Sequence, residues 1–175
     1  MPTVILDAGH GGSDFGATFE GRREKDDNLA LTLAVGDILA ENGVNVLFTR
    51  TTDIYETPTA KAQEGNASGA DYFISIHRNS SPIPNQYTGI ESLVYNRNST
   101  AANIAENINR NLEAVGFANQ GINERKNLAV LRRTTMPAVL VEAGFINNEQ
   151  DNALFDERFD EIAQAIADGI LESIQ

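Results

Sequence analysis

The sequence contains only two histidines, His10 and His77, and each comes just after a short apolar run. A glutamate, Glu142, comes directly after a third apolar run at residues 138–141. In open α/β sheets, ligands bind beyond the carboxyl ends of the strands. If these runs are neighbouring parallel strands, we therefore expect the three side chains to converge at one edge of a sheet.

Two neutral imidazoles and one carboxylate are typical protein ligands of a catalytic zinc ion, which keeps a fourth position open. Such a site needs a carboxylate ligand and a separate general base. The glycines around His10 let the backbone turn sharply and leave space beside the ring. The candidate carboxylates are Glu24, Glu20, Asp14 and Glu142. The residues alone leave open which of them would bind the metal and which would react.

Each of these residues also has a simpler interpretation. A histidine after a strand is more often a hydrogen-bonded structural residue, and Glu24 lies in a charged stretch typical of solvated surface. The glycine loop at residues 9–14 could cradle a phosphate, but it lacks the third glycine of the dinucleotide fingerprint, no Lys-Ser/Thr follows, and Asp14 would repel the anion. Glu142 is hardest to explain structurally, because a carboxylate this close to an apolar strand needs a partner or a reaction.

Alternating strand-like and helix-like segments must position these residues. Short apolar runs predict strands at residues 3–6, 44–48, 72–76, 89–95, 127–131 and 138–141. Helical spacing of apolar residues predicts helices at 28–41, 58–68 and 104–115 and one long helix from about residue 156 to the end. Thr57 and Pro58 are typical of a helix N-cap and first helical position, and Gly69 of a helix end. This order predicts an α/β fold: a mostly parallel twisted sheet of about six strands, covered by helices on both faces.

The length and composition fit one globular domain spanning residues 1–175, since the chain has 175 residues of which 41% are hydrophobic. The absence of cysteine excludes disulfides, thiolate zinc fingers, iron–sulfur clusters and a cysteine nucleophile. No run of 18 apolar residues predicts a membrane span, and no signal-peptide pattern is visible at the N-terminus. The net charge of −12 argues against binding to nucleic acid or to anionic membranes. We expect a monomer.

At this level of detail the chain resembles the zinc-dependent N-acetylmuramoyl-L-alanine amidases of the amidase-3 family, which act on bacterial cell walls as autolysins, sporulation enzymes and phage endolysins. The matching motifs are LDAGHGGSDFGA at residues 6–17, Glu24-Lys25, LFTR at 47–50 with Asp53, Asn66-Ala67, SIHRN at 75–79, and residues 137–148. They occur in family order over almost the whole chain. One departure is Lys61, where members commonly carry arginine.

The resemblance implies roles that the residues alone leave open. It assigns a Zn²⁺ ion to His10, Glu24 and His77, and it makes Glu142 the catalytic acid/base. It implies a substrate, peptidoglycan, cleaved at the amide between the lactyl group of N-acetylmuramic acid and L-alanine of the stem peptide. We further predict that Asn79, Gly12 and Asp14 contact substrate.

A non-catalytic, amidase-like module that binds peptidoglycan without cutting it is the alternative, but it would require loss of a ligand or of Glu142, and neither is lost. Many cell walls are polyanionic, so the acidic chain should need a separate cell-wall-binding module outside residues 1–175. Some members of the family carry a helix that plugs the active site. Residues 80–88 contain two prolines, which predicts no such helix and an open groove.

Overall fold

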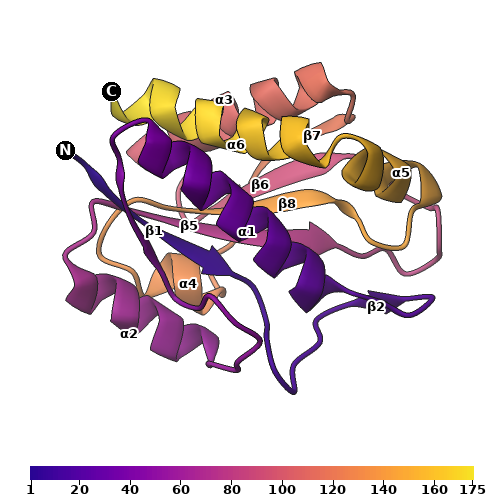
Figure 1. The fold of residues 1–175 in the computed structure, drawn as a ribbon, viewed down its shortest axis with the longest axis horizontal. Helices are drawn as coiled ribbons and strands as arrows, with labels where there is room; N and C mark the ends of the chain where they lie inside the picture. Colours follow the sequence, from indigo (N-terminus) through magenta and orange to yellow (C-terminus); the bar gives the residue numbers. More distant parts are fainter.

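The computed structural model describes all 175 residues, and they form a central sheet between two layers of helices (Figure 1). The sheet strands are β1 (Thr3–Ala8), β4 (Asn45–Phe48), β5 (Tyr72–Asn79), β6 (Ile90–Val94), β7 (Asn119–Glu124) and β8 (Ala138–Phe145). Their spatial order is β4-β1-β5-β8-β6-β7. The first four are mutually parallel, β6 is antiparallel to β8, and β7 is parallel to β6. The prediction of about six mostly parallel strands is confirmed.

The helices lie on both faces of this sheet, as expected (Figure 1). One face is covered by α1 (Glu24–Glu41), α3 (Thr100–Val115) and α6 (Phe159–Ile174), and the other by α2 (Pro58–Ser68) and the short α4 (Ala129–Arg132). Two further elements complete the chain: the hairpin of β2 (Thr18–Phe19) and β3 (Arg22–Arg23), and α5 (Glu149–Glu157). No helix combines the length and the apolar content that crossing a bilayer requires.

Side chains alternate between the two faces along each strand, so each buried strand contributes side chains to a core on either side of the sheet. Val4 and Leu6 of β1 belong to the larger core of 27 buried residues, whereas Ile5 between them belongs to a smaller core of eight. The larger core lies under α1, α3 and α6. The smaller core lies under α2 and α4. We call the side of the sheet with the larger core the thick face and the side with the smaller core the thin face.

The connections around β1 create a crevice at the carboxyl end of the parallel strands. The chain leaves β1 through α1 on the thick face to reach β4, and then returns through α2 on the thin face to β5, which lies on the other side of β1. The strand order reverses here, since β1 connects to β4 on one side while β5 connects to β6 on the other. Such a reversal marks a topological switch point, where open α/β sheets bind ligands. Here that point lies between β1 and β5.

One local prediction is wrong, and one helix was not predicted. Residues 127–131 were expected to form a strand, but Ala129–Arg132 is helix α4 and the sixth strand is β7. This edge strand reads NQGINE and is largely exposed, so it carries no apolar run. The C-terminal helix expected from about residue 156 is α6, which begins at Phe159. The helix before it, α5, was not predicted; it begins after Asn148, which accepts a hydrogen bond from the backbone N–H of Asp151 (2.9 Å).

Helix boundaries elsewhere follow their capping residues. Thr57 accepts the backbone N–H of Ala60 through its hydroxyl oxygen (3.1 Å), and Gly69 takes the left-handed conformation, as expected for α2. Helix α1 begins at Glu24, four residues before the predicted start, because its first turn is acidic rather than apolar. That earlier start places Glu24 at the positive end of the helix.

Candidate metal centre

Three of the sequence-predicted side chains meet at the switch point. Suitable donor atoms of His10, Glu24 and His77 all lie within 4.8 Å of one another. Nε2 of His10 is 3.3 Å from Oε1 of Glu24, and Nδ1 of His77 is 3.0 Å from Oε2 of the same carboxylate. The centroids of the two imidazole rings are 5.0 Å apart, and the ring planes are nearly perpendicular. The carboxylate of Glu24 therefore contacts both rings, and the three donor groups are close enough together to share one cation.

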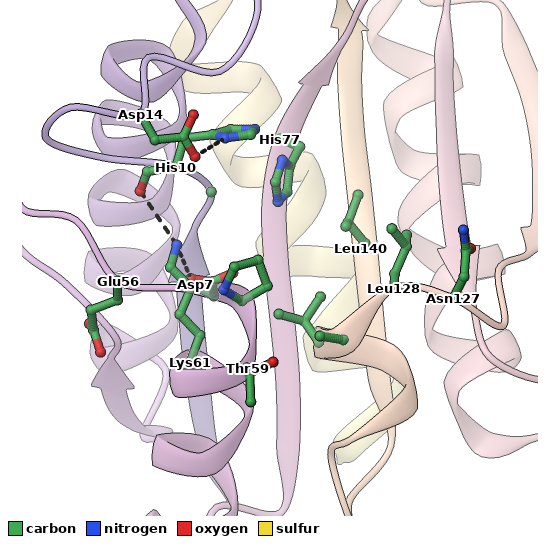
Figure 2. Close-up of a pocket in the computed structure, with 14 residues that line it drawn as sticks. Asp7, His10, Asp14, Glu56, Thr59, Lys61, His77, Asn127, Leu128 and Leu140 are labelled. Carbon is green, nitrogen blue, oxygen red and sulfur yellow. Dashed lines mark hydrogen bonds and ion pairs between the residues drawn. The ribbon is translucent and has the colours of Figure 1, made fainter.

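His10 is held by the glycine loop that follows β1. Its backbone is left-handed (φ 65°), and Gly11 and Asp14 form two backbone hydrogen bonds that close the loop. Oδ2 of Asp14 accepts a hydrogen bond from Nδ1 of His10 (2.7 Å; Figure 2). A carboxylate on the far nitrogen of a histidine is the usual way to orient a metal-binding imidazole. Nε2 is thus the nitrogen that faces the centre.

Glu24 is fixed by three N–H donors. Oε1 accepts the backbone N–H of Ala17 (3.0 Å), and Oε2 accepts the backbone N–H of Arg78 (3.1 Å) and the side-chain amide of Asn28 (3.1 Å). Burial raises the pKa of Glu24, but the hydrogen bonds and charges of His10 and His77 outweigh burial and hold the pKa well below its usual range. Glu24 is therefore a carboxylate with a fixed orientation.

His77 lies within β5 rather than after it, because that strand continues to Asn79. Its ring packs directly against the backbone of Gly9, so closely that a Cβ atom at position 9 would overlap the imidazole. Glycine is therefore required at position 9 by the ring of His77.

The same contacts determine the protonation of His10 in the metal-free protein. Burial lowers the pKa of His10, but hydrogen bonds and charge from Glu24, and then from Asp14, raise it to about 9. A proton on His10 takes the place of a cation between the ring and the carboxylate, and metal binding would have to displace it.

Glu142 lies beside this group on the next strand. It is the register partner of His77 in the β5–β8 pair, and its Oε2 is buried without a hydrogen-bond partner. Burial raises the pKa of Glu142 to about 7, with the charge of His77 opposing the increase. A carboxyl group with this pKa can both accept and donate a proton near neutral pH.

The structure brings Glu24, and neither Glu20 nor Asp14, against both histidines. Glu20 is exposed at the tip of the β2–β3 hairpin with a left-handed backbone (φ 49°). Asp14 contacts the opposite nitrogen of His10 and accepts the backbone N–H of Gly16 (3.0 Å).

The residues predicted to contact substrate have structural partners. Asn79 donates from its amide to Oε1 of Glu91 (3.2 Å) and accepts the backbone N–H of Ser80 (2.9 Å). Gly12 donates its N–H to Oδ1 of Asp53 (2.8 Å), and its carbonyl accepts from Lys25 (3.0 Å). Asp14 is engaged with His10. Substrate contact by these three residues stays a prediction.

The glycine loop cannot cradle a phosphate in this conformation. Its N–H groups are already used: Gly9 donates to the carbonyl of Ile76, Gly11 to that of Asp14, and Gly12 to Asp53. A phosphate loop needs such groups free and a helix that begins directly behind it. Here the β2–β3 hairpin comes before the next helix.

Two residues near the centre were missed in the sequence. Asn28 is fully buried and bonds both Glu24 and the carbonyl of Gly9 (3.1 Å). Its spacing of four residues from Glu24 on a helix was the available signal. Glu91 is the register partner of Glu142 and accepts the amide of Asn123 (2.7 Å). An isolated carboxylate in the predicted strand 89–95 was the signal there.

A cavity of about 410 Å³ adjoins the two histidines on the thin face. It lies between the start of α2 and α4, with Leu140 of β8 and residues 127–130 on one side and Thr59 and Lys61 on the other (Figure 2). The loop 80–88 on the opposite side contains no helix. Asn147 holds it by donating to the carbonyl of Ser81 (2.7 Å).

The donor set fits a metal ion. Two imidazole nitrogens and a carboxylate oxygen converge, and the carboxylate and one ring are oriented by further hydrogen bonds. These ligands suit zinc and other borderline divalent metals. The site can hold a metal ion next to a proton-transferring carboxyl group and an open cavity.

Comparison with known proteins gives a consistent result. A family model described as N-acetylmuramoyl-L-alanine amidase matches residues 4–172. The endolysin of Bacillus phage SPP1 is 35% identical over 179 residues, covering 97% of this chain and 65% of that protein. The sporulation-specific N-acetylmuramoyl-L-alanine amidase of Bacillus subtilis (strain 168) is 39% identical over 155 residues, covering 86% of this chain and 59% of that protein. The chain thus spans about three-fifths of these relatives.

A solved structure from the same family has the same fold. The solved catalytic domain of CwlV, an N-acetylmuramoyl-L-alanine amidase from Bacillus (Paenibacillus) polymyxa var. colistinus, superposes with a TM-score of 0.90. It is 37% identical, and the match covers 98% of this chain and 97% of that one. The sheet and helix arrangement described above is therefore that of the solved catalytic domain.

Proposed function

We propose that this chain, which belongs to the amidase-3 family of N-acetylmuramoyl-L-alanine amidases, is a zinc-dependent peptidoglycan hydrolase. Its substrate is the amide between the lactyl group of N-acetylmuramic acid and L-alanine of the stem peptide. The family match over nearly the whole chain supports the reaction, and the converging donor set supports the need for a metal.

His10, Glu24 and His77 would hold the zinc ion. The bound ion would lower the pKa of a water molecule towards about 7 and offset negative charge on the amide oxygen. Asp14 keeps Nδ1 of His10 occupied, so Nε2 remains for the metal. Asn28 and the backbone N–H groups keep the carboxylate of Glu24 pointed at the same place.

Glu142 would transfer the proton. Its carboxylate accepts a proton from the attacking water as the water oxygen bonds to the lactyl carbonyl carbon. The same carboxyl group then donates this proton to the amide nitrogen as the carbon–nitrogen bond breaks. The products are a free lactyl carboxylate and a stem peptide with a free amino terminus.

One observation carries this proposal: the unpartnered, buried Oε2 of Glu142 lies on the strand next to His77, in register with it. A buried carboxyl oxygen without a partner is costly to stability, so such groups are enriched at reactive sites. This oxygen lies at the same end of the sheet as both histidines and the carboxylate of Glu24, namely the carboxyl end of the parallel strands.

The test is Glu142→Gln, which keeps the shape of the side chain and removes its ability to shuttle a proton. We expect hydrolysis of purified peptidoglycan to fall by at least about 100-fold, the contribution typical of general acid–base catalysis. The zinc content by atomic absorption should remain at the parental level. Digestion at near the parental rate would contradict the role of Glu142.

Two further measurements separate the alternatives. Mass spectrometry of the parent digest should give N-acetylmuramic acid without its peptide and a peptide beginning with L-alanine. His10→Ala should lose both zinc and activity. A parent protein that binds peptidoglycan but releases no such fragments would support the non-catalytic module.

The site of action follows from the substrate. We infer that the chain acts at the bacterial cell wall. Because its net charge is −12, electrostatics should not attract it to polyanionic walls, and a separate wall-binding module would bring it there.

A further inference from the structure

A buried ion pair lies beneath the metal centre. Lys61 of α2 is only 3% exposed, and its Nζ is 2.9 Å from Oδ1 of Asp7, which is 1% exposed. The hydroxyl groups of Thr49 and Ser75 donate to the same carboxylate at 2.7 and 2.6 Å. Asp7 is therefore fully satisfied and keeps the ammonium charge of Lys61 neutralised inside the protein.

The remaining donors of Lys61 reach the loop that carries His10. Its ammonium donates to the carbonyl of Ala8 at 2.9 Å and to the carbonyl of His10 at 3.4 Å (Figure 2). Arg50 also bonds this loop, at the carbonyls of Ala8 (3.0 Å) and Gly9 (3.1 Å). The His10 carbonyl is reached by Lys61 and not by Arg50.

His10 needs such a contact because its backbone is left-handed, a conformation that residues with a Cβ atom rarely adopt. The conformation turns the carbonyl of His10 towards Lys61 and its imidazole towards Glu24. If the carbonyl had no cationic partner, the peptide could rotate to a more common conformation, and the imidazole would move with it.

We propose that Lys61 is a positioning residue for the metal centre: neutralised by Asp7, it holds the carbonyl of His10 and thereby keeps the imidazole aimed at the shared cation position. This inference rests on the proposed zinc site. Lys61 itself touches neither the metal ligands' donor atoms nor the scissile bond. Its effect is transmitted through the backbone of residues 8–10.

The decisive variant is Lys61→Met, which keeps an unbranched side chain, one atom shorter, and removes its three donors. Zinc affinity is measured on metal-free protein by competition with a chelating indicator. We expect a 10- to 100-fold loss, the range typical of removing a group that orients a metal ligand. Cobalt(II), used as a second probe, should show a changed visible absorption spectrum, because its bands report ligand geometry. Lys61→Arg, which keeps the charge, should restore most of the affinity and the parental spectrum.

A purely structural role would give a different result. The control is Asn109→Ala, which removes another buried side chain (2% exposed) whose partners are Ser92, Asn119 and Gly121, away from the centre. It should lower stability and leave zinc affinity and the cobalt spectrum unchanged. If Lys61→Met does not fold because Asp7 is left unpaired, the double variant Asp7→Asn, Lys61→Met removes both charges and is measured in the same way.

The outcomes are distinct. A folded Lys61→Met or double variant with parental zinc affinity and an unchanged cobalt spectrum would overturn the inference while leaving the proposed function intact. A parent protein that binds no zinc would overturn the metal centre and this inference together. Loss of affinity in Lys61→Met with rescue by Lys61→Arg would support it.

Discussion

The thick face of the sheet packs 27 buried apolar residues under α1, α3 and α6, whereas the thin face packs eight under α2 and α4. Both faces are built by the same strands, so the difference comes mainly from the helices: α1, α3, α5 and α6 supply more than half of the larger core, whereas α4 supplies only Val130 and Leu131 to the smaller one. A further part comes from how far along each strand the apolar side chains continue.

On the thin face the apolar positions stop before the strands end. Ile5, Phe73, Leu93 and Leu140 pack there, and the positions two residues nearer the cavity are polar: Asp7, Ser75, Glu91 and Glu142, with His77 next along β5. On the thick face β1 and β8 stay apolar through Ala8 and Ala143, and the polar exceptions Arg78 and Ser92 are buried. The larger apolar core therefore lies on one face and the candidate site on the other, and this contrast can be tested.

The largest expected effect is on stability, from truncating matched leucines on the two faces. Leu112→Ala on α3 should cost about 3–5 kcal/mol, because the side chain is fully buried in the larger core. Leu131→Ala on α4 should cost about 2 kcal/mol, the low end for such changes, because its core is small and adjoins a cavity. Urea unfolding measures both. Equal losses would show that the two faces contribute alike.

A smaller effect, on zinc affinity, should come from Gly9→Ala. The new methyl group would overlap the ring of His77, so the imidazole must move and affinity should fall about 10- to 100-fold. Gly43→Ala is the control: Gly43 lies after α1 with a left-handed backbone (φ 81°), and its Cβ position is open. It should lower stability slightly and leave zinc binding unchanged. Parental affinity in Gly9→Ala would show that the packing of His77 is not critical.

The smallest effect should appear in acid. Burial raises the pKa of Asp7, but the charge of Lys61 and the hydrogen bond from Ser75 outweigh burial and lower it. The stability that this group contributes is therefore present above its unfolded pKa of about 3.9 and is lost as pH falls through the lowered folded value. Below about pH 4 the unfolding free energy of Asp7→Asn, Lys61→Met should fall less steeply than that of the parent. If the unfolding free energies of the parent and the double variant fall in parallel with pH, the thin face is no more sensitive to acid than the rest of the protein.

The sequence predicts most of the fold because the apolar runs and capping residues act locally. Residues 3–6, 72–76 and 138–141 are strands in the structure, and α2 begins and ends at its predicted caps. β7 could not be found in this way, since an exposed edge strand needs few apolar side chains. Its stability comes from pairing with β6, which is a long-range contact.

The residues of the candidate site also fall into those that a local sequence pattern reveals and those that it does not. His10, His77 and Glu142 stand out in the sequence because each is a polar residue beside an apolar run. Glu24 does not, because it lies among five other charged residues; apart from the family resemblance, it is the approach of α1 to β5 that distinguishes it from Glu20 and Asp14. The contribution of Lys61 depends on the backbone conformation of His10, which no local pattern reveals.

The order of these residues along the chain has a consequence for synthesis. His10, Glu24 and His77 all lie in the first 77 residues, whereas Glu142 lies on β8, which becomes β5's second neighbour. Chains emerge from the ribosome N-terminus first. A nascent chain therefore contains every proposed ligand of the metal well before it contains the group proposed to move the proton. The proposed hydrolytic capacity would therefore await the synthesis of β8 and its pairing with β5.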